Sequence, residues 1–258
     1  MNATVDNNEE ELAEGTLLSH LVELRSRLVK IFASVLVVFV CLLPFANKLF
    51  GMASRPIIEA LPGNQMIATG VASPLLTPFV LTAYIALFVA MPVVLYQVWA
   101  FVAPGLYQKE KRFAIPLFIT SVLLFYTGLA FAYFVVFPLI FGFFTATTPA
   151  GVEFQPDIKA FLDFALMIVL AFGLAFEVPI ATVLIVWTGL TTPQKLGRAR
   201  PYVFLGAFVI GMFLTPPDVI SQTLLAVPVY LLYELGILMS RILSRQRDEE
   251  ADEAPTPG

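Results

Sequence analysis

The feature that most constrains this chain is a series of long apolar stretches that carry almost no charge. A stretch of about 18 residues or more can cross the hydrocarbon core of a bilayer as a helix, which satisfies its own backbone hydrogen bonds. These stretches do not alternate polar and apolar residues, as the strands of a membrane barrel do. The sequence therefore predicts an all-α polytopic membrane protein.

The composition supports this class. Only 13% of the residues are charged, whereas a soluble domain has about 25%. The single cysteine, Cys41, cannot form an intrachain disulfide, and the single histidine, His20, has no cysteine or second histidine nearby for a metal site. The first 14 residues are acidic, unlike a cleavable signal peptide. We therefore expect no metal, no cofactor and no nucleic-acid partner.

The apolar stretches and the breaks between them predict three regions. Residues 1–16 form a disordered acidic tail, residues 17–240 form a six-helix transmembrane domain, and residues 241–258 form a second tail. Residues 16–30 are predicted to form an amphipathic surface helix, and residues 47–74 to form a long exposed connection with Pro56 as a breaker. The six spans are expected at about residues 29–46, 75–102, 113–144, 160–188, 202–214 and 219–240.

The distribution of Lys and Arg predicts the orientation. Twelve of the 15 lie in the N-terminal segment, in the loops after the second and fourth spans, and in the C-terminal tail. The other side has only Lys48, Arg55 and Lys159. Because the cytoplasmic loops of membrane proteins carry the excess of positive charge, both termini are expected in the cytoplasm, with the chain in the cytoplasmic (inner) membrane.

Two features predict a cupped bundle with short helices 5 and 6. The fifth stretch, bounded by Pro201, has about 13 residues, or about 20 Å of helix, against a hydrocarbon core of about 30 Å. Prolines inside the spans should bend the helices, because proline removes a backbone hydrogen bond and clashes with the preceding turn. These prolines are Pro78, Pro92, Pro116, Pro138, Pro179 and Pro228.

Polar residues inside or beside the spans are few. Glu177 lies near the middle of the fourth span, where a charge costs about 2.5–3.5 kcal/mol, so it is either functional or an internal lock between helices. Gln222 is a weaker candidate, because an amide can simply bond across helices. Asp218 fits a structural helix cap, and Glu234 fits a local ion pair with Arg241 on the same helix face.

Two carboxylates on the cytoplasmic side are candidates for ligand binding. Glu23 is followed four residues later by Arg27, which offers a local ion pair as the alternative. Glu110 lies among Lys109, Lys111 and Arg112, which could simply neutralise it. Two carboxylates on one face could accept a ligand with two guanidinium groups, because a guanidinium matches a carboxylate with two parallel hydrogen bonds.

The residue patterns are compatible with three classes of function: a receptor, a transporter or channel, and a scaffold. No P-loop and no Gly-x-Ser-x-Gly motif is present, so an enzyme is not predicted. A proton-coupled secondary transporter or channel with Glu177 as relay is the alternative to a receptor, although a relay normally needs further ionisable residues at the same depth. A scaffold without a ligand of its own is the third class.

Several segments, in this order, resemble the TatC subunit of the twin-arginine (Sec-independent) protein translocase. They cover nearly the whole chain apart from the tails and parts of the outer loops. These segments are HLVELRSRL from His20, ASPLLTPF from Ala72, LYQVWAFVAPGLYQKEKR from Leu95, FYTGLAFAYFVVFPL from Phe125, FGLAFEVP from Phe172, and RPYVFLGAFVIGMFLTPPDVISQTLLAVPVYLLYE from Arg200.

The resemblance implies a six-helix receptor with both termini in the cytoplasm, which binds the signal peptides of folded proteins and nucleates the translocation complex. It implies that the signal-peptide residues are Glu23, Arg25, Phe101 and Glu110. It also implies that the single-span subunits TatB and TatA approach Glu177 and Gln222. The resemblance further implies that the TatC-like chain forms homo-oligomers within the complex and that the proton motive force drives transport. The family often has Arg where this chain has Lys111, which keeps the charge but loses the planar fork.

Overall fold

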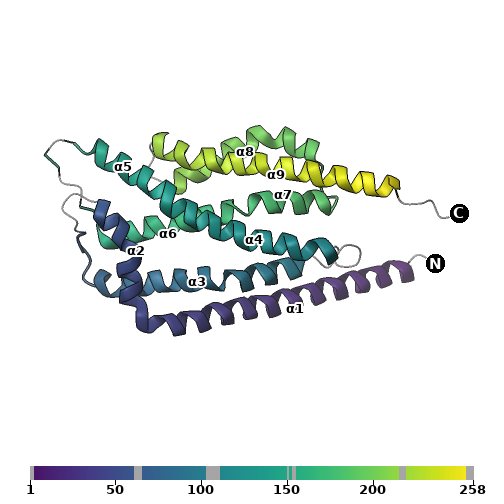
Figure 1. The fold of residues 1–258 in the computed structure, drawn as a ribbon. Coiled ribbons are helices and arrows are strands. Elements are labelled where there is room, and N and C mark those ends of the chain that lie inside the picture. Colours follow the sequence, from purple (N-terminus) through teal and green to yellow (C-terminus); the bar gives the residue numbers. More distant parts are fainter. Residues whose placement is uncertain are drawn as a thin grey trace.

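The computed structural model describes residues 3–60, 66–102, 111–149, 151–152, 155–214 and 219–253. In this part of the chain the structure is helical, and its one β-type pairing is the isolated bridge between Ile67 and Asp157. Both chain ends lie at the same end of the molecule (Figure 1). The prediction of an all-α polytopic membrane protein is confirmed, since five of the described helical segments are long and apolar enough to cross a bilayer.

The first helix, α1, runs from Ala3 to Leu42 and is followed by a 3-10 turn, Leu43–Phe45, and by α2, Ala46–Ala60. The acidic segment that was predicted to be disordered is therefore helical from Ala3, because Glu, Leu and Ala are good helix formers that extend a helix already nucleated. The predicted surface helix is part of the same α1. The connection expected after the first span is in large part α2, and Pro56 lies within this helix.

The second and third spans are α3, Ser73–Val102, and a composite helix made of α4, Lys111–Phe131, a π-helical turn, Ala132–Val136, and α5, Phe137–Thr147. The π turn has a local cause in Pro138, which has no amide hydrogen and cannot bond to the carbonyl four residues back. In the turn the Phe137 amide instead donates to the Ala132 carbonyl, five residues back. The predicted span at 113–144 thus forms, with a wider turn in it.

The fourth span is divided into α6, Ile158–Ala175, and α7, Val178–Trp187. The sequence predicted one span across residues 160–188. The interruption falls at Phe176 and Glu177, two positions before Pro179, which has no amide to continue the α-helical ladder. Glu177 therefore lies at a helix junction, where backbone groups are less completely paired than within a helix.

The last two helices are α8, Pro193–Leu214, and α9, Val219–Glu253. The sequence placed a basic loop at 191–200 and a boundary at Pro201, but α8 passes through Pro201 and starts at Pro193. Thr192 caps it, because its hydroxyl accepts from the Lys195 amide at 3.3 Å. Its apolar part still begins only at Tyr202. At the other chain end, α9 continues beyond the predicted boundary at 240 into the tail.

The connection before α3 is tied to the start of α6 by Asp157. One carboxylate oxygen of Asp157 accepts from the amides of Lys159 and Ala160, and the other accepts from the amide and hydroxyl of Thr69, at 2.7–3.1 Å. The Ile158 amide also donates to the Ile67 carbonyl at 2.8 Å. The Thr69 backbone hydrogen bond, with the other bonds, holds the pKa of Asp157 well below its usual range.

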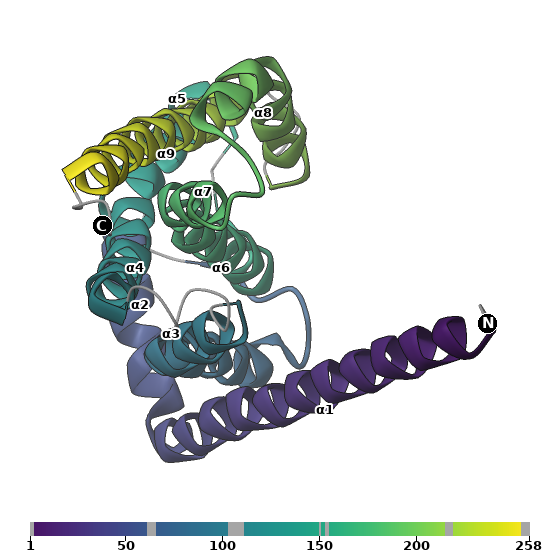
Figure 2. The same ribbon diagram turned by 90° about the vertical axis from the view of Figure 1, so that its right-hand side faces the viewer.

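The helices form an open arc rather than a closed bundle (Figure 2). At one end of the arc α1 packs chiefly on α3, and at the other end α8 packs chiefly on α9. The buried core lies between them, where α4, the π turn and α5 pack on α6 through residues such as Phe125, Ile140, Ile168 and Phe172. The most apolar window of α1 buries none of its residues, so this helix presents its apolar surface outward.

Candidate functional site

Arg27 connects α1 to α3. Its Nε and Nη2 atoms donate to Oε1 of Glu23 at 3.0 and 2.5 Å, and its Nη1 atom donates to Oε1 of Gln97 at 3.3 Å. Glu23 and Arg27 lie on one face of α1 because they are four residues apart, and Gln97 is buried near the end of α3. The local ion pair that the sequence offered for Glu23 is present, but its arginine also reaches a second helix.

Glu23 keeps one carboxylate oxygen available. Both hydrogen bonds from Arg27 end on Oε1, and Oε2 accepts none from the residues that the structure describes. The Glu23 side chain is 38% exposed, whereas that of Arg27 is 20% exposed. A carboxylate has lone pairs on both oxygens, so Glu23 can accept a further N–H donor without losing Arg27.

The predicted signal-peptide residues that the structure describes gather at one end of the molecule. Phe101 is half-buried in the last turn of α3, one turn beyond Gln97. Arg25 is exposed on α1, two positions from Glu23 and from Arg27, and therefore on another face of the helix than this pair. Glu110 lies outside the described residues. The described helices before and after it, α3 ending at Val102 and α4 beginning at Lys111, both have these ends at this end of the molecule (Figure 1).

Gln97 was missed by the sequence reasoning. The available signal was a lone amide within the charge-free stretch of the second span. In the structure this amide is the group that holds Arg27 against α3. It therefore positions the Glu23–Arg27 pair at the end of the second span.

Glu177 has one satisfied and one unsatisfied carboxylate oxygen. The buried hydroxyl of Ser121, on α4, donates to Oε2 at 2.5 Å. The other oxygen, Oε1, is buried and has no hydrogen-bond partner among the described residues. A buried polar atom without a partner is costly. Glu177 is thus partly an internal link between α4 and the α6–α7 junction, with capacity for one more donor.

Gln222 forms a hydrogen bond to a neighbouring helix, which was the simpler of the two roles predicted for it. Its Nε2 atom donates to the Phe208 carbonyl of α8 at 2.6 Å. It does not lie at the depth of Glu177. Gly236 of α9 is the residue that faces Pro179, two positions after Glu177, and Gln222 lies about 14 residues, or about 21 Å, before Gly236 on the same helix. Asp218, its predicted neighbouring cap, lies outside the described residues.

The predicted pairing of Glu234 with Arg241 is wrong. Glu234 binds Arg200 of α8 instead, with Nη2 donating to Oε2 at 2.7 Å and Nε lying 2.6 Å from Oε1. Tyr230 also donates to Oε1 at 2.9 Å. Glu234 and Arg241 are seven positions apart, which corresponds to about 10 Å along the helix axis. Arg200 reaches across from the neighbouring helix.

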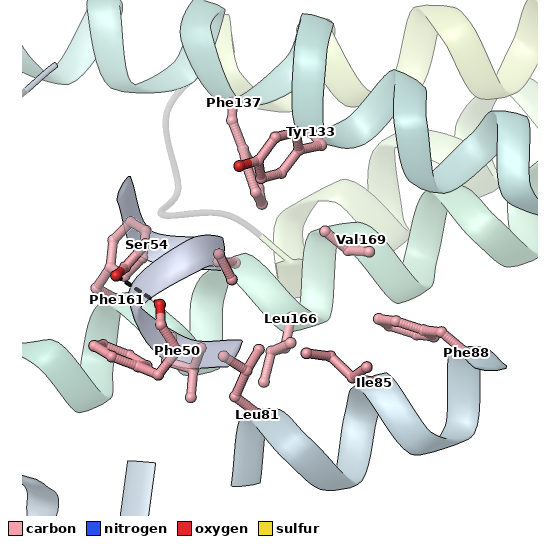
Figure 3. A pocket seen from close by; sticks show the side chains of 13 residues that line it. Phe50, Ser54, Leu81, Ile85, Phe88, Tyr133, Phe137, Phe161, Leu166 and Val169 are labelled. Atoms are coloured by element: carbon pink, nitrogen blue, oxygen red, sulfur yellow. Dashed lines mark hydrogen bonds between the residues drawn. The ribbon is translucent and has the colours of Figure 1, made fainter. Parts of the chain in front are cut away.

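A cavity of about 150 Å³ lies between α2, α3, the π turn with α5, and α6. In Figure 3 Tyr133 and Phe137 point toward Leu81 and Ile85 of α3. The lining is almost wholly apolar, and the one short hydrogen bond there is from Ser54 to the Phe50 carbonyl, at 2.7 Å. Such a cavity can hold an apolar group.

The fold and these polar positions define a polytopic helical membrane protein with an open arc of helices and a carboxylate site at one end. Comparisons with known proteins give the family. The family model described as Sec-independent protein translocase protein (TatC) matches residues 19–228. The chain belongs to the TatC family and is a component of the Sec-independent protein translocase.

Individual relatives agree. The chain is 55% identical over 241 residues to the TatC protein of Azotobacter chroococcum mcd 1, which covers 93% of this chain and 94% of the relative. It is 53% identical over 237 residues to that of Escherichia coli (strain K12), covering 90% and 92%. A crystal structure described as the twin-arginine translocase receptor TatC superposes with a TM-score of 0.79 at 36% identity, covering 87% and 99%. Nothing in these likenesses supports a proton-coupled transporter.

Proposed function

We propose that this subunit is the receptor for twin-arginine signal peptides, and that Glu23 and Glu110 accept the two arginines. The observation that carries the proposal is the asymmetric use of the Glu23 carboxylate. Oε1 is held by Arg27, while Oε2 is open to a donor from outside the described structure. An arriving guanidinium would bind a carboxylate whose position is already fixed, which lowers the entropic cost of binding.

Arg27 helps rather than blocks this binding in the proposed arrangement. Because Gln97 holds a third nitrogen of Arg27, the guanidinium is anchored to α3 and keeps Glu23 oriented. Glu110 would supply the second carboxylate from the segment between α3 and α4. Phe101 would contact the apolar part of the peptide beside the arginine pair, and Arg25 would contribute from the exposed face of α1.

We also propose that the intramembrane polar positions contact partner subunits. Glu177, whose buried Oε1 has no partner among the described residues, would turn this oxygen outward to accept a hydrogen bond from a single-span partner helix, TatB or TatA. Gln222 would contribute a weaker polar contact at another depth. The outward apolar surface of α1 would contact lipid or a second copy of the chain, as expected for a homo-oligomer within the complex.

The proposed setting is the cytoplasmic membrane, with both termini in the cytoplasm and transport driven by the proton motive force. The Lys and Arg distribution supports this orientation, and both chain ends lie at the same end of the molecule (Figure 1). Binding and assembly, rather than catalysis, are the activities proposed for the chain.

The binding of a labelled twin-arginine peptide to the purified protein tests the receptor proposal. A charge-assisted hydrogen bond contributes about 1.5–3 kcal/mol, so Glu23→Gln should weaken binding by about 10- to 100-fold. Glu110→Gln should weaken binding comparably, and a peptide with a lysine pair should bind less well to the unchanged protein. Asp163→Asn is the matched control, because Asp163 is an exposed carboxylate near the start of α6 that pairs with Lys159.

Equal affinity of the unchanged protein and the Glu23→Gln, Glu110→Gln double variant would refute the assignment. If the double variant loses the same affinity for the arginine-pair and lysine-pair peptides, the carboxylates recognise only the net charge of the peptide and not its guanidinium groups. For Glu177, a Glu177→Ala variant that still assembles with TatB would leave Glu177 as a purely internal link to Ser121.

A further inference from the structure

A second charged site lies between α8 and α9, away from Glu23 and Glu177. A cavity of about 430 Å³ is lined by Arg200, Glu234 and Arg241, and by four apolar side chains of α9. The apolar lining residues are Leu231, Leu235, Ile237 and Leu238.

The charges in this cavity are not balanced. Glu234 is fully engaged, because Arg200 contacts both of its oxygens and Tyr230 donates to one of them. The Arg241 guanidinium forms no hydrogen bond or short ion pair with any residue that the structure describes. Its Nη2 atom instead lies over the first turns of α8, beside Gly197. Arg200 and Glu234 therefore neutralise each other, and Arg241 leaves one positive charge facing the cavity.

The cavity also lies at the depth where lipid headgroups are found. The apolar span of α9 runs from Val219 to Ser244, so Arg241 lies in its last turn. Arg200 lies just before the apolar part of α8, which begins at Tyr202. Both arginines thus mark the boundary between apolar and polar surface on adjacent helices, which is the level of the headgroup phosphates.

The wall below the arginines is suited to acyl chains. Leu231, Leu235 and Leu238 are 60%, 45% and 54% exposed, and they follow one another along α9 toward the middle of the membrane. A ligand that fits this lining has an anionic head and an apolar tail. A guanidinium binds a phosphate through two parallel hydrogen bonds. In a zwitterionic headgroup the cation of the headgroup itself cancels the phosphate charge, which weakens the attraction to the guanidinium.

We propose that the groove between α8 and α9 binds an anionic phospholipid. Its phosphate is held by Arg241, with Arg200 as the second guanidinium, and its acyl chain lies along Leu231, Leu235 and Leu238. The proposal does not use the signal-peptide site, and the two can succeed or fail independently.

The test is native mass spectrometry of the full-length protein, titrated in detergent with dioleoyl phosphatidylglycerol or with dioleoyl phosphatidylcholine. These lipids share acyl chains and differ in headgroup charge. We expect phosphatidylglycerol to bind about tenfold more tightly, and we expect Arg241→Gln to remove most of that difference. Arg241→Lys should have an intermediate effect, because it keeps the charge and loses the fork.

Arg198→Gln is the matched control. It removes the same charge from an exposed residue of α8 that does not line the cavity, so it should leave the phosphatidylglycerol preference unchanged. If Arg198→Gln and Arg241→Gln reduce phosphatidylglycerol affinity equally, the preference comes from diffuse surface charge and the proposed site is refuted. Equal binding of the two lipids to the unchanged protein would also overturn it. Unchanged melting temperatures of both variants would show that a loss of lipid binding is not caused by misfolding.

Discussion

At the scale of single residues, Asp157 accepts hydrogen bonds from more backbone amides than any other described carboxylate of the chain. It caps α6 with one oxygen and holds Thr69 with the other, so the connection that precedes α3 is tied to a helix 88 residues further along. Each of these hydrogen bonds favours the ionised carboxylate, which is why the pKa of Asp157 lies well below its usual range.

Asp157→Asn should lower the melting temperature at neutral pH, because the amide can accept with only one oxygen. The pH dependence follows from the lowered pKa in the folded state. The contribution of ionised Asp157 is fully present above its ordinary pKa of about 3.9 and is lost as the pH falls below that value. The difference in melting temperature between the two proteins should therefore narrow below about pH 4. A difference that stays constant down to pH 2.5 in thermal scans would contradict this account.

At the scale of elements, two helices approach closely because a glycine lies between them. Gly236 of α9 faces α7, and a Cβ atom at this position would lie 2.9 Å from Cα of Pro179 and 3.2 Å from Cβ of Thr182. Small residues allow helix backbones in membranes to pack at short distance. This contact holds the α8–α9 pair to the rest of the arc, since α7 is the main neighbour of α9 apart from α8.

Gly236→Leu should destabilise the protein by about 1–3 kcal/mol, the usual cost of forcing extra atoms into a packed interface. Gly142→Leu is a suitable control, because Gly142 is also in a membrane helix and a Cβ atom there meets nothing within 4 Å. Denaturant titration of both variants in the same detergent measures the difference. Equal stabilities would show that α7 and α9 can separate without cost.

At the scale of the whole molecule, the open arc leaves the end helices with one principal neighbour each. The apolar window of α1 has no buried residue, compared with half of the window that covers α6 and α7. Lipid or partner helices must cover such a surface in the membrane. The arc also places both chain ends together, which agrees with an even number of crossings when α8, with its short apolar part, is counted with the five longer segments (Figure 1).

The proposed orientation can be tested with single cysteines in a Cys41→Ser background. We expect a membrane-impermeant maleimide to label Val152→Cys in right-side-out vesicles, and to label Gln194→Cys only in inverted vesicles. Both positions are exposed. Val152 follows the end of α5 and Gln194 lies in the first turn of α8, and these two helix ends lie at opposite ends of the molecule (Figure 1). Labelling of the two positions from the same side would contradict the predicted topology.

The sequence by itself determined the class of the protein, the approximate position of the apolar helices and several of the polar residues within them. Hydropathy is a local property, so about 18 apolar residues predict a crossing wherever they occur. For the same reason Glu177 and Gln222 could be recognised as exceptions without knowledge of their neighbours.

Only the tertiary structure decided which partners these residues have. Glu234 binds Arg200 rather than Arg241, and Arg27 reaches Gln97 as well as Glu23, because these contacts depend on how separate helices pack. The break at Glu177 and the helical path through Pro201 show a similar limit. A proline removes one hydrogen bond, but the neighbouring helices decide whether the chain breaks or continues there.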